Sequence, residues 1–171
     1  MHWILATSAS RQRDFFQGVH AALKPSGVFC FEMGGMGNVA EMRTALLGAV
    51  GRRVGIDKAR AVDPWFFPDE GWMRTMLEDE GEGGGEGGGR FKFKVERIER
   101  EYRPTRADEG GIEGWVRLMG KQFLDAVGKE GSEEREACLT EVCDVLKTVS
   151  HSPGGGDWLG YVRLRVLARK I

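Results

Sequence analysis

The feature that most constrains the fold is a continuous apolar run, Val28-Phe29-Cys30-Phe31, which follows a Pro25-Ser26-Gly27 turn. Before the turn, apolar residues recur at the spacing of one helix face: Phe16, Val19 and Leu23. A strand without alternation of apolar and polar residues is typical of a sheet that helices cover on both faces. The sequence therefore predicts an open α/β sheet with residues 28–33 as its most buried strand.

The rest of the chain alternates between strand-like and helix-like segments. Residues 3–6 are predicted to end a buried strand. Two further strands are predicted, one at 91–102 with an irregularity before Ile98 and one at 162–168. Helix starts are predicted at Ser10, at Asn38 with Glu41 as a capping box, and at Pro68 as a first helical residue. Two amphipathic helices are predicted at 112–126 and 139–149. The last strand alternates apolar and polar residues, which predicts an antiparallel strand at or near a sheet edge.

Composition excludes several classes of function. The net charge of -1, with both signs well mixed, gives no electrostatic footprint for nucleic acid or an anionic membrane. No apolar run is long enough to span a bilayer, and the first residues lack the basic leader of a signal peptide. The three histidines are scattered, so no metal cluster is visible. Cys30, Cys138 and Cys143 share no CxxC spacing and are expected to be buried free thiols, in keeping with a cytoplasmic protein.

Several motifs, in this order, resemble the downstream half of a class I S-adenosylmethionine-dependent methyltransferase. His2-Trp3-Ile4 is similar to the end of that family's fourth strand, and Leu23-Lys24-Pro25-Ser26-Gly27 is similar to its "LKPGG" turn, with serine in place of the first glycine. The closer resemblance is to the trans-aconitate and malonyl-carrier-protein methyltransferase subgroup. It rests on His2-Trp3 and on three further segments: 32–38, 65–68 and 110–115.

The resemblance implies an incomplete Rossmann-like sheet, with a two-helix lid inserted before a last, antiparallel strand. It implies one truncated methyltransferase domain over residues 1–171, with residues 81–89 as a loop insertion. S-adenosylmethionine would be the cofactor, although the family's main cofactor-binding motifs belong upstream of Met1. We therefore expect this chain alone to bind the cofactor weakly and to be inactive.

The function that follows is methyl transfer to a small-molecule or carrier-bound acid. Two alternatives stay open: a non-catalytic truncated pseudo-enzyme or fragment that only binds a partner, and an unrelated α/β binding module. No catalytic residue is assigned. A sulfonium is already a good leaving group, so alignment, which can supply about 7–11 kcal/mol, does most of the work.

The resemblance also implies which residues face the ligands. The cofactor-binding candidates are His2 and Trp3. The substrate-binding candidates are Glu32, Gly34, Gly35, Trp65, Tyr102, Trp115 and Arg117. Each has a structural alternative, because large aromatic residues are often core and arginines are mostly solvated. Arg163 and Arg165 are expected to form a charged sheet edge that discourages aggregation.

The glycine-rich tract Gly81–Gly89 generates a test of its own. It holds seven glycines and two glutamates, a composition that cannot bury surface to offset its ordering entropy. We expect that shortening the tract to a tight turn leaves the melting temperature nearly unchanged, measured by circular dichroism. A large loss of stability would show that the tract packs against the protein.

Overall fold

A computed structural model describes residues 1–78 and 92–171, and the predicted glycine-rich loop 81–89 lies outside them. The chain divides into two compact units. Unit 1 comprises Met1–Asn38, Trp65–Tyr102 and Val162–Ile171. Unit 2 comprises Val39–Pro64 and Arg103–Tyr161.

Unit 1 contains a sheet of three strands in the order β1-β3-β2. The strands are β1 (Val28–Gly34), β2 (Phe93–Arg106) and β3 (Trp158–Lys170), of which the last two continue into unit 2. β1 pairs antiparallel with β3 in a register that runs from Val28↔Arg169 to Gly34↔Arg163. The Ile171 N–H donates to the Lys92 carbonyl and the Ala107 N–H to the Asp157 carbonyl, so β2 and β3 are antiparallel as well. The antiparallel direction predicted for the last strand is confirmed.

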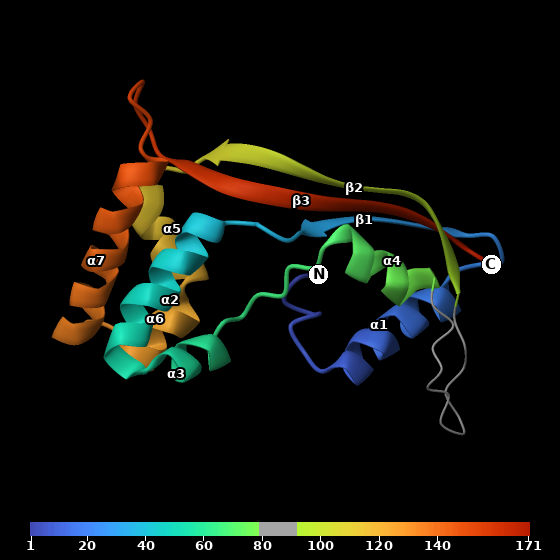
Figure 1. Cartoon of the computed structure of the whole chain (residues 1–171), viewed down its shortest axis with the longest axis horizontal. Helices are drawn as coiled ribbons and strands as arrows, with labels where there is room; N and C mark the ends of the chain where they lie inside the picture. Colours follow the sequence, from blue (N-terminus) through green and yellow to red (C-terminus); the bar gives the residue numbers. More distant parts are fainter. Residues whose placement is uncertain (79–91) are drawn as a thin grey trace. The chain divides into compact units, whose positions relative to one another are not determined.

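The helices α1 (Ala9–Ala22) and α4 (Glu70–Glu78) lie on one face of this sheet (Figure 1). Their apolar side chains form a single core with the inward side chains of all three strands. The largest members are Phe16 of α1, Met73 and Leu77 of α4, Met33, Phe93 and Leu164. This core is what holds unit 1 together, since apolar burial is the main favourable term in folding.

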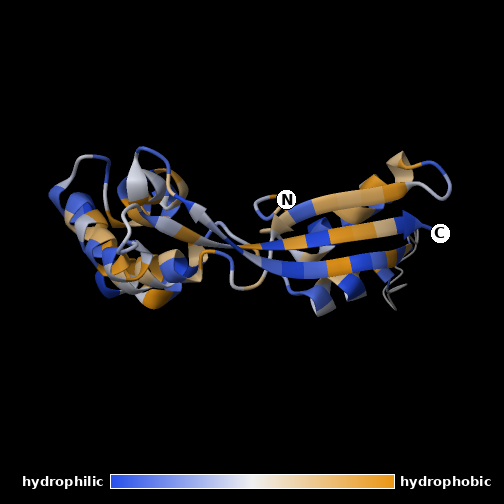
Figure 2. Ribbon diagram, turned by 90° about the horizontal axis from the view of Figure 1, so that it is seen from above, coloured by the Kyte–Doolittle hydropathy of each residue, from blue (hydrophilic) through white to orange (hydrophobic). Residues whose placement is uncertain are grey.

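Burial of β1 on both faces was a wrong prediction. Phe29, Phe31 and Met33 turn toward the core, whereas Val28, Cys30 and Glu32 are exposed. Hydrophobic residues dominate β1, whereas hydrophobic and hydrophilic residues alternate along β3 (Figure 2). In the part of the chain that the structure describes, helices cover only one face of β1. Cys30 is therefore exposed and not buried as expected.

β3 lies between the other two strands, next to both edges of the sheet, so it is near an edge but not at one. Its alternation has a different cause, because a central antiparallel strand with one covered face also alternates. Along β2, two successive exposed residues, Glu96 and Arg97, interrupt the alternation, in keeping with the predicted irregularity before Ile98.

The first residues form turns and not the end of a buried strand. Trp3 is 55% exposed, whereas Leu5 is fully buried and its carbonyl accepts a hydrogen bond of 2.7 Å from Gln12 Nε2. The predicted cap at Ser10 is wrong, since Ser10 lies inside α1 and Ser8 is the N-cap.

The predicted capping box at Asn38 and Glu41 is wrong for an instructive reason. Helix α2 (Ala40–Val54) begins after Val39, and neither side chain caps it. Asn38 Oδ1 accepts a hydrogen bond of 2.8 Å from the Val162 N–H, and Glu41 Oε1 accepts one of 2.6 Å from the Gly160 N–H. These β3 amides lie beyond the stretch that pairs with β1. The two side chains thus satisfy backbone donors that the ladder leaves without strand partners.

Pro68 was predicted as a first helical residue, but α4 begins two residues later. Asp69 supplies the helix cap, since its Oδ1 accepts a hydrogen bond of 2.7 Å from the Trp72 N–H. An acidic side chain at this position satisfies a donor that the first helical turn leaves open.

Unit 2 is helical apart from the strand ends. It consists of α2, α3 (Ile56–Ala61), α5 (Gly111–Met119), α6 (Lys121–Val127) and α7 (Glu133–Ser150). The helix predicted at 112–126 is broken at Gly120, where an added Cβ would lie 2.7 Å from the Val116 carbonyl oxygen. On α7, Cys138 and Cys143 are buried as predicted, and burial raises the pKa of the Cys143 thiol to about 11. Val149, the last residue of the predicted amphipathic helix, is exposed.

Across residues 1–78 and 92–171, no helix has the length and apolar character needed to cross a membrane.

The hydrogen bond from Val162 to Asn38 can be tested by mutation. Asn38 is only 4% exposed, so Asn38→Ala leaves a buried donor unsatisfied and should lower the free energy of unfolding by about 1–3 kcal/mol. Urea unfolding followed by circular dichroism measures the loss. The matched control is Gln122→Ala, which removes an exposed amide on α6 and should change stability by less than about 0.5 kcal/mol. Equal stabilities for the two variants would contradict the assignment.

Candidate functional site

The candidate site is built on the last residue of β1 and the turn that follows it, residues 34–37. The Gly35 N–H donates to the Val162 carbonyl over 3.0 Å, and the Met36 N–H donates to the Pro68 carbonyl over 2.9 Å. Arg100 of β2 donates from Nη1 to the Met36 carbonyl over 3.1 Å. Because three separate segments hold its backbone, the turn has a fixed conformation.

Glycine is required in this turn because neighbouring atoms leave no room for a side chain. An added Cβ on Gly34 would lie 2.7 Å from a ring carbon of Phe67, and one on Gly35 would lie 3.0 Å from Cβ of Leu164. Both glycines, predicted as substrate-binding residues, therefore let other elements approach β1 closely.

His2 lies beside this turn. Its Nδ1 accepts a long hydrogen bond of 3.5 Å from the Gly34 N–H. The imidazole is 4.7 Å from the Trp3 ring and 5.5 Å from the Phe67 ring, centroid to centroid, and Trp65 stacks on Phe67 at 6.1 Å. His2, Trp3, Trp65 and Phe67 thus form an aromatic wall next to residues 34–37.

The His2 imidazole is uncharged at neutral pH. Burial, followed by the positive charges of the terminal amino group and of Arg163, lowers its pKa to about 4. Since Nδ1 accepts a hydrogen bond from the Gly34 N–H, the neutral ring carries its own proton on Nε2. The ring can therefore donate one hydrogen bond to a ligand.

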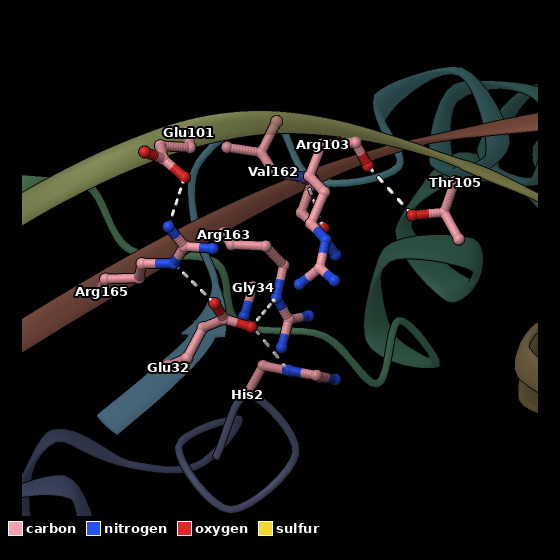
Figure 3. Close-up of polar contacts among 10 residues, drawn as sticks. His2, Glu32, Gly34, Glu101, Arg103, Thr105, Val162, Arg163 and Arg165 are labelled. Atoms are coloured by element: carbon pink, nitrogen blue, oxygen red, sulfur yellow. Dashed lines mark hydrogen bonds and ion pairs between the residues drawn. The ribbon is translucent and has the colours of Figure 1, made fainter. Parts of the chain in front are cut away.

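Glu32 is held between two arginines of β3 (Figure 3). Its Oε1 accepts a hydrogen bond of 2.9 Å from Arg163 Nε, and its Oε2 accepts one of 2.7 Å from Arg165 Nε. Arg165 also donates from Nη1 to Glu101 of β2. The hydrogen bond from Arg165 and then the other contacts with both arginines hold the pKa of Glu32 below its ordinary value. Glu32 is thus an ionised anchor for arginines and is poorly suited to take up a proton.

Two further substrate-binding candidates lie in unit 2. Trp115 donates from Nε1 to the Tyr161 hydroxyl over 2.8 Å. Arg117 donates from Nε to Glu113 and from Nη1 and Nη2 to Glu136, and these hydrogen bonds raise its pKa. Tyr102, the remaining candidate, belongs to unit 1 and is 70% exposed on β2.

Unit 1 thus brings together six of the predicted site residues: His2, Trp3, Glu32, Gly34, Gly35 and Trp65. Sequence reasoning missed the roles of Arg100 and Arg163 here. The only signal for Arg163 was its alternation with Arg165 on the last strand, which equally fits a charged edge. Glu32, the shared partner of Arg163 and Arg165, is 131 residues away from Arg163 in the sequence.

Aromatic ring faces attract cations, so the wall can contact a cationic group.

Comparison with known proteins gives one relevant relative. No protein-family model matches the chain. The chain is 29% identical over 175 residues to an uncharacterized methyltransferase of Schizosaccharomyces pombe. The alignment covers 99% of this chain but only 59% of the length of that relative. A distant homologue of the chain is therefore a methyltransferase, and the mixed α/β fold with its antiparallel three-stranded sheet is consistent with part of a methyltransferase fold.

The low pKa of His2 makes stability depend on pH. The unfolded imidazole takes up a proton near pH 6.5 and the folded one only near pH 4, so the unfolded state binds more protons between these values. Stability should fall as the pH drops through this window. At pH 4 the wild type should lose about 1–3 kcal/mol more than His2→Gln, whose side chain cannot titrate.

Urea unfolding of both proteins at pH 7, 5.5 and 4 measures this difference, and comparison with His2→Gln cancels the titration of the carboxylates. Parallel stability profiles for the two proteins would show that His2 titrates normally in the folded state.

Proposed function

We propose that the protein to which this chain belongs transfers a methyl group from S-adenosylmethionine to a small-molecule or carrier-bound acid. The observation that carries the proposal is the similarity to a methyltransferase along 99% of the chain. The closer assignment to the trans-aconitate and malonyl-carrier-protein subgroup rests on the motifs of the sequence and is part of the same proposal, as is a cytoplasmic setting.

The proposal gives each group of the site a role. When bound, S-adenosylmethionine supplies an electrophilic methyl group on a positively charged sulfur. His2 and Trp3 would hold the cofactor at the aromatic wall, and the fixed turn at Gly34 and Gly35 would leave room for the acceptor beside it. Orientation of the two reactants by these rigid parts would provide most of the acceleration.

Acid–base chemistry has little part in this proposal. Glu32 is ionised but bound by two arginines, which makes it a weak proton acceptor. His2 has its pKa near 4, so the imidazole is a weak base as well and would act as a hydrogen-bond donor through Nε2. An acid acceptor needs no base, because a carboxylate is already deprotonated at neutral pH.

Unit 2 enters the proposal through the resemblance alone. The segment that carries Trp115 and Arg117 corresponds to the lid of the resembling family, and its helices α5, α6 and α7 would provide that lid. Tyr102 would belong to the acceptor site on the same ground.

The proposal is tested by methyl transfer from tritiated S-adenosylmethionine to a panel of small carboxylic acids and carrier-bound acids. The enzyme is the product of the whole reading frame that contains this chain. We expect transfer to at least one acid, and a loss of roughly 10-fold in kcat/KM for His2→Ala, which removes a hydrogen-bonding group and an aromatic contact.

The matched control is His151→Ala, which removes an exposed histidine from unit 2 and should leave kcat/KM within about 2-fold. If that protein transfers no methyl group to any acid of the panel, the proposal fails, and the alternative of a non-catalytic, partner-binding protein takes its place.

A further inference from the structure

Arg163 differs from Arg117 and Arg165 in what its guanidinium binds. Arg117 uses Nε, Nη1 and Nη2 for two glutamates, and Arg165 uses Nε and Nη1 for Glu32 and Glu101. Arg163 uses Nε alone, which donates to Glu32. Among the residues that the structure describes, its terminal nitrogens Nη1 and Nη2 have no protein partner.

Arg163 is nevertheless held in place. It lies on the central strand of the sheet, opposite Gly34 at the last paired position of β1. Its hydrogen bond of 2.9 Å to Glu32 fixes one side of the guanidinium plane, and the side chain is only 24% exposed. A guanidinium held in this way loses less conformational freedom on binding than that of a mobile surface arginine.

The open side of this guanidinium belongs to the candidate site. The charge of Arg163 lowers the pKa of His2, so a positive potential extends from Arg163 to the imidazole. In Figure 3 the Arg163 guanidinium lies between Glu32 and the His2 ring, close to Gly34. A ligand beside His2 therefore meets the two unused donors of Arg163.

The chemistry of these donors selects an anion with two parallel oxygens. The two terminal N–H groups of a guanidinium match the geometry of a carboxylate and bind it through two hydrogen bonds. Single point charges such as chloride do not use this geometry. The rings of Trp3 and Phe67, which contact His2, add apolar surface beside these donors, which suits an organic acid.

We propose that Nη1 and Nη2 of Arg163 bind a carboxylate of the acid methyl acceptor, beside the neutral His2. That the bound acid is a methyl acceptor rests on the function proposed above, whereas the carboxylate site itself does not. Arg163 is then a specificity-determining residue, and Arg165, on the same strand and with the same glutamate partner, is structural.

Binding of a simple dicarboxylate tests the site without the cofactor. The full chain is titrated with succinate at constant ionic strength and followed by NMR of the arginine Nε–Hε and glycine N–H groups. One bidentate contact at a partly exposed site predicts a dissociation constant on the order of 1–10 mM. Succinamide, which has the same shape but no charge, should not bind.

Arg163→Gln should weaken succinate binding by about 10-fold or more, and the matched control Arg165→Gln by less than about 3-fold. Arg163→Lys keeps the charge but not the two parallel N–H donors of the guanidinium. A loss of succinate affinity between those of the wild type and Arg163→Gln supports bidentate binding. Arg163→Lys also serves as the second variant if Arg163→Gln fails to fold, which thermal unfolding reports.

Three outcomes overturn the inference: no succinate binding by the wild type, equal losses for Arg163→Gln and Arg165→Gln, and equal binding of succinate and succinamide. If succinate binds through Arg163 but no acid accepts a methyl group, the proposed function fails and the carboxylate site stands. If methyl transfer occurs and is unaffected by Arg163→Gln, the site fails and the proposed function stands.

Discussion

The antiparallel ladder between β1 and β3 brings together parts of the chain that are far apart in the sequence. Glu32 and Arg163, whose side chains are joined by a hydrogen bond across it, are separated by 131 residues. β3 lies between β1 and β2, and its inward side chains belong to the same core as those of α1, α4 and β2. Contacts of such high sequence separation are slow to form, because the entropy of closing the intervening chain is lost before any contact compensates for it.

The ladder also explains the polar groups that surround the turn after β1. β3 continues past the end of β1, so its next amide groups need other acceptors, and Asn38 and Glu41 supply them. The glycines of the turn allow Phe67 and Leu164 to approach, and Arg100 binds its backbone from the far strand. One strand pairing therefore fixes the turn, and through the turn the surroundings of His2.

How much the sequence could predict depends on how local each feature is. The strand at residues 28–33, the buried thiols of α7 and the antiparallel last strand follow from local patterns, and the structure confirms them. The face of β1 that is buried, the central position of β3 and the partners of Asn38 and Glu41 depend on which distant segments meet. The spacing of Asn38 and Glu41 matches a capping box, but only the register of β3 reveals their actual partners.

The roles of His2 and Arg163 show the same limit at the site. A histidine at a strand end is a visible candidate, but its low pKa depends on burial and on a charge from the last strand. For Arg163 and Arg165 the sequence offers two equivalent arginines, and only the positions of Glu32 and Glu101 separate them. Charge pairs across strands cannot be identified from one sequence, because nothing in the sequence around one residue indicates its distant partner.

The exposed face of β1 has a practical consequence for chemistry on this protein. Cys30 is exposed, whereas Cys138 and Cys143 are buried, with burial raising the pKa of both thiols. Alkylating reagents attack the accessible thiolate first, so a maleimide dye would attach to Cys30 in preference to the other two. Cys30 lies two residues before Glu32 on the same exposed side of the strand. A fluorophore placed there would report on ligands that enter the arginine-lined end of the sheet, with no engineered cysteine.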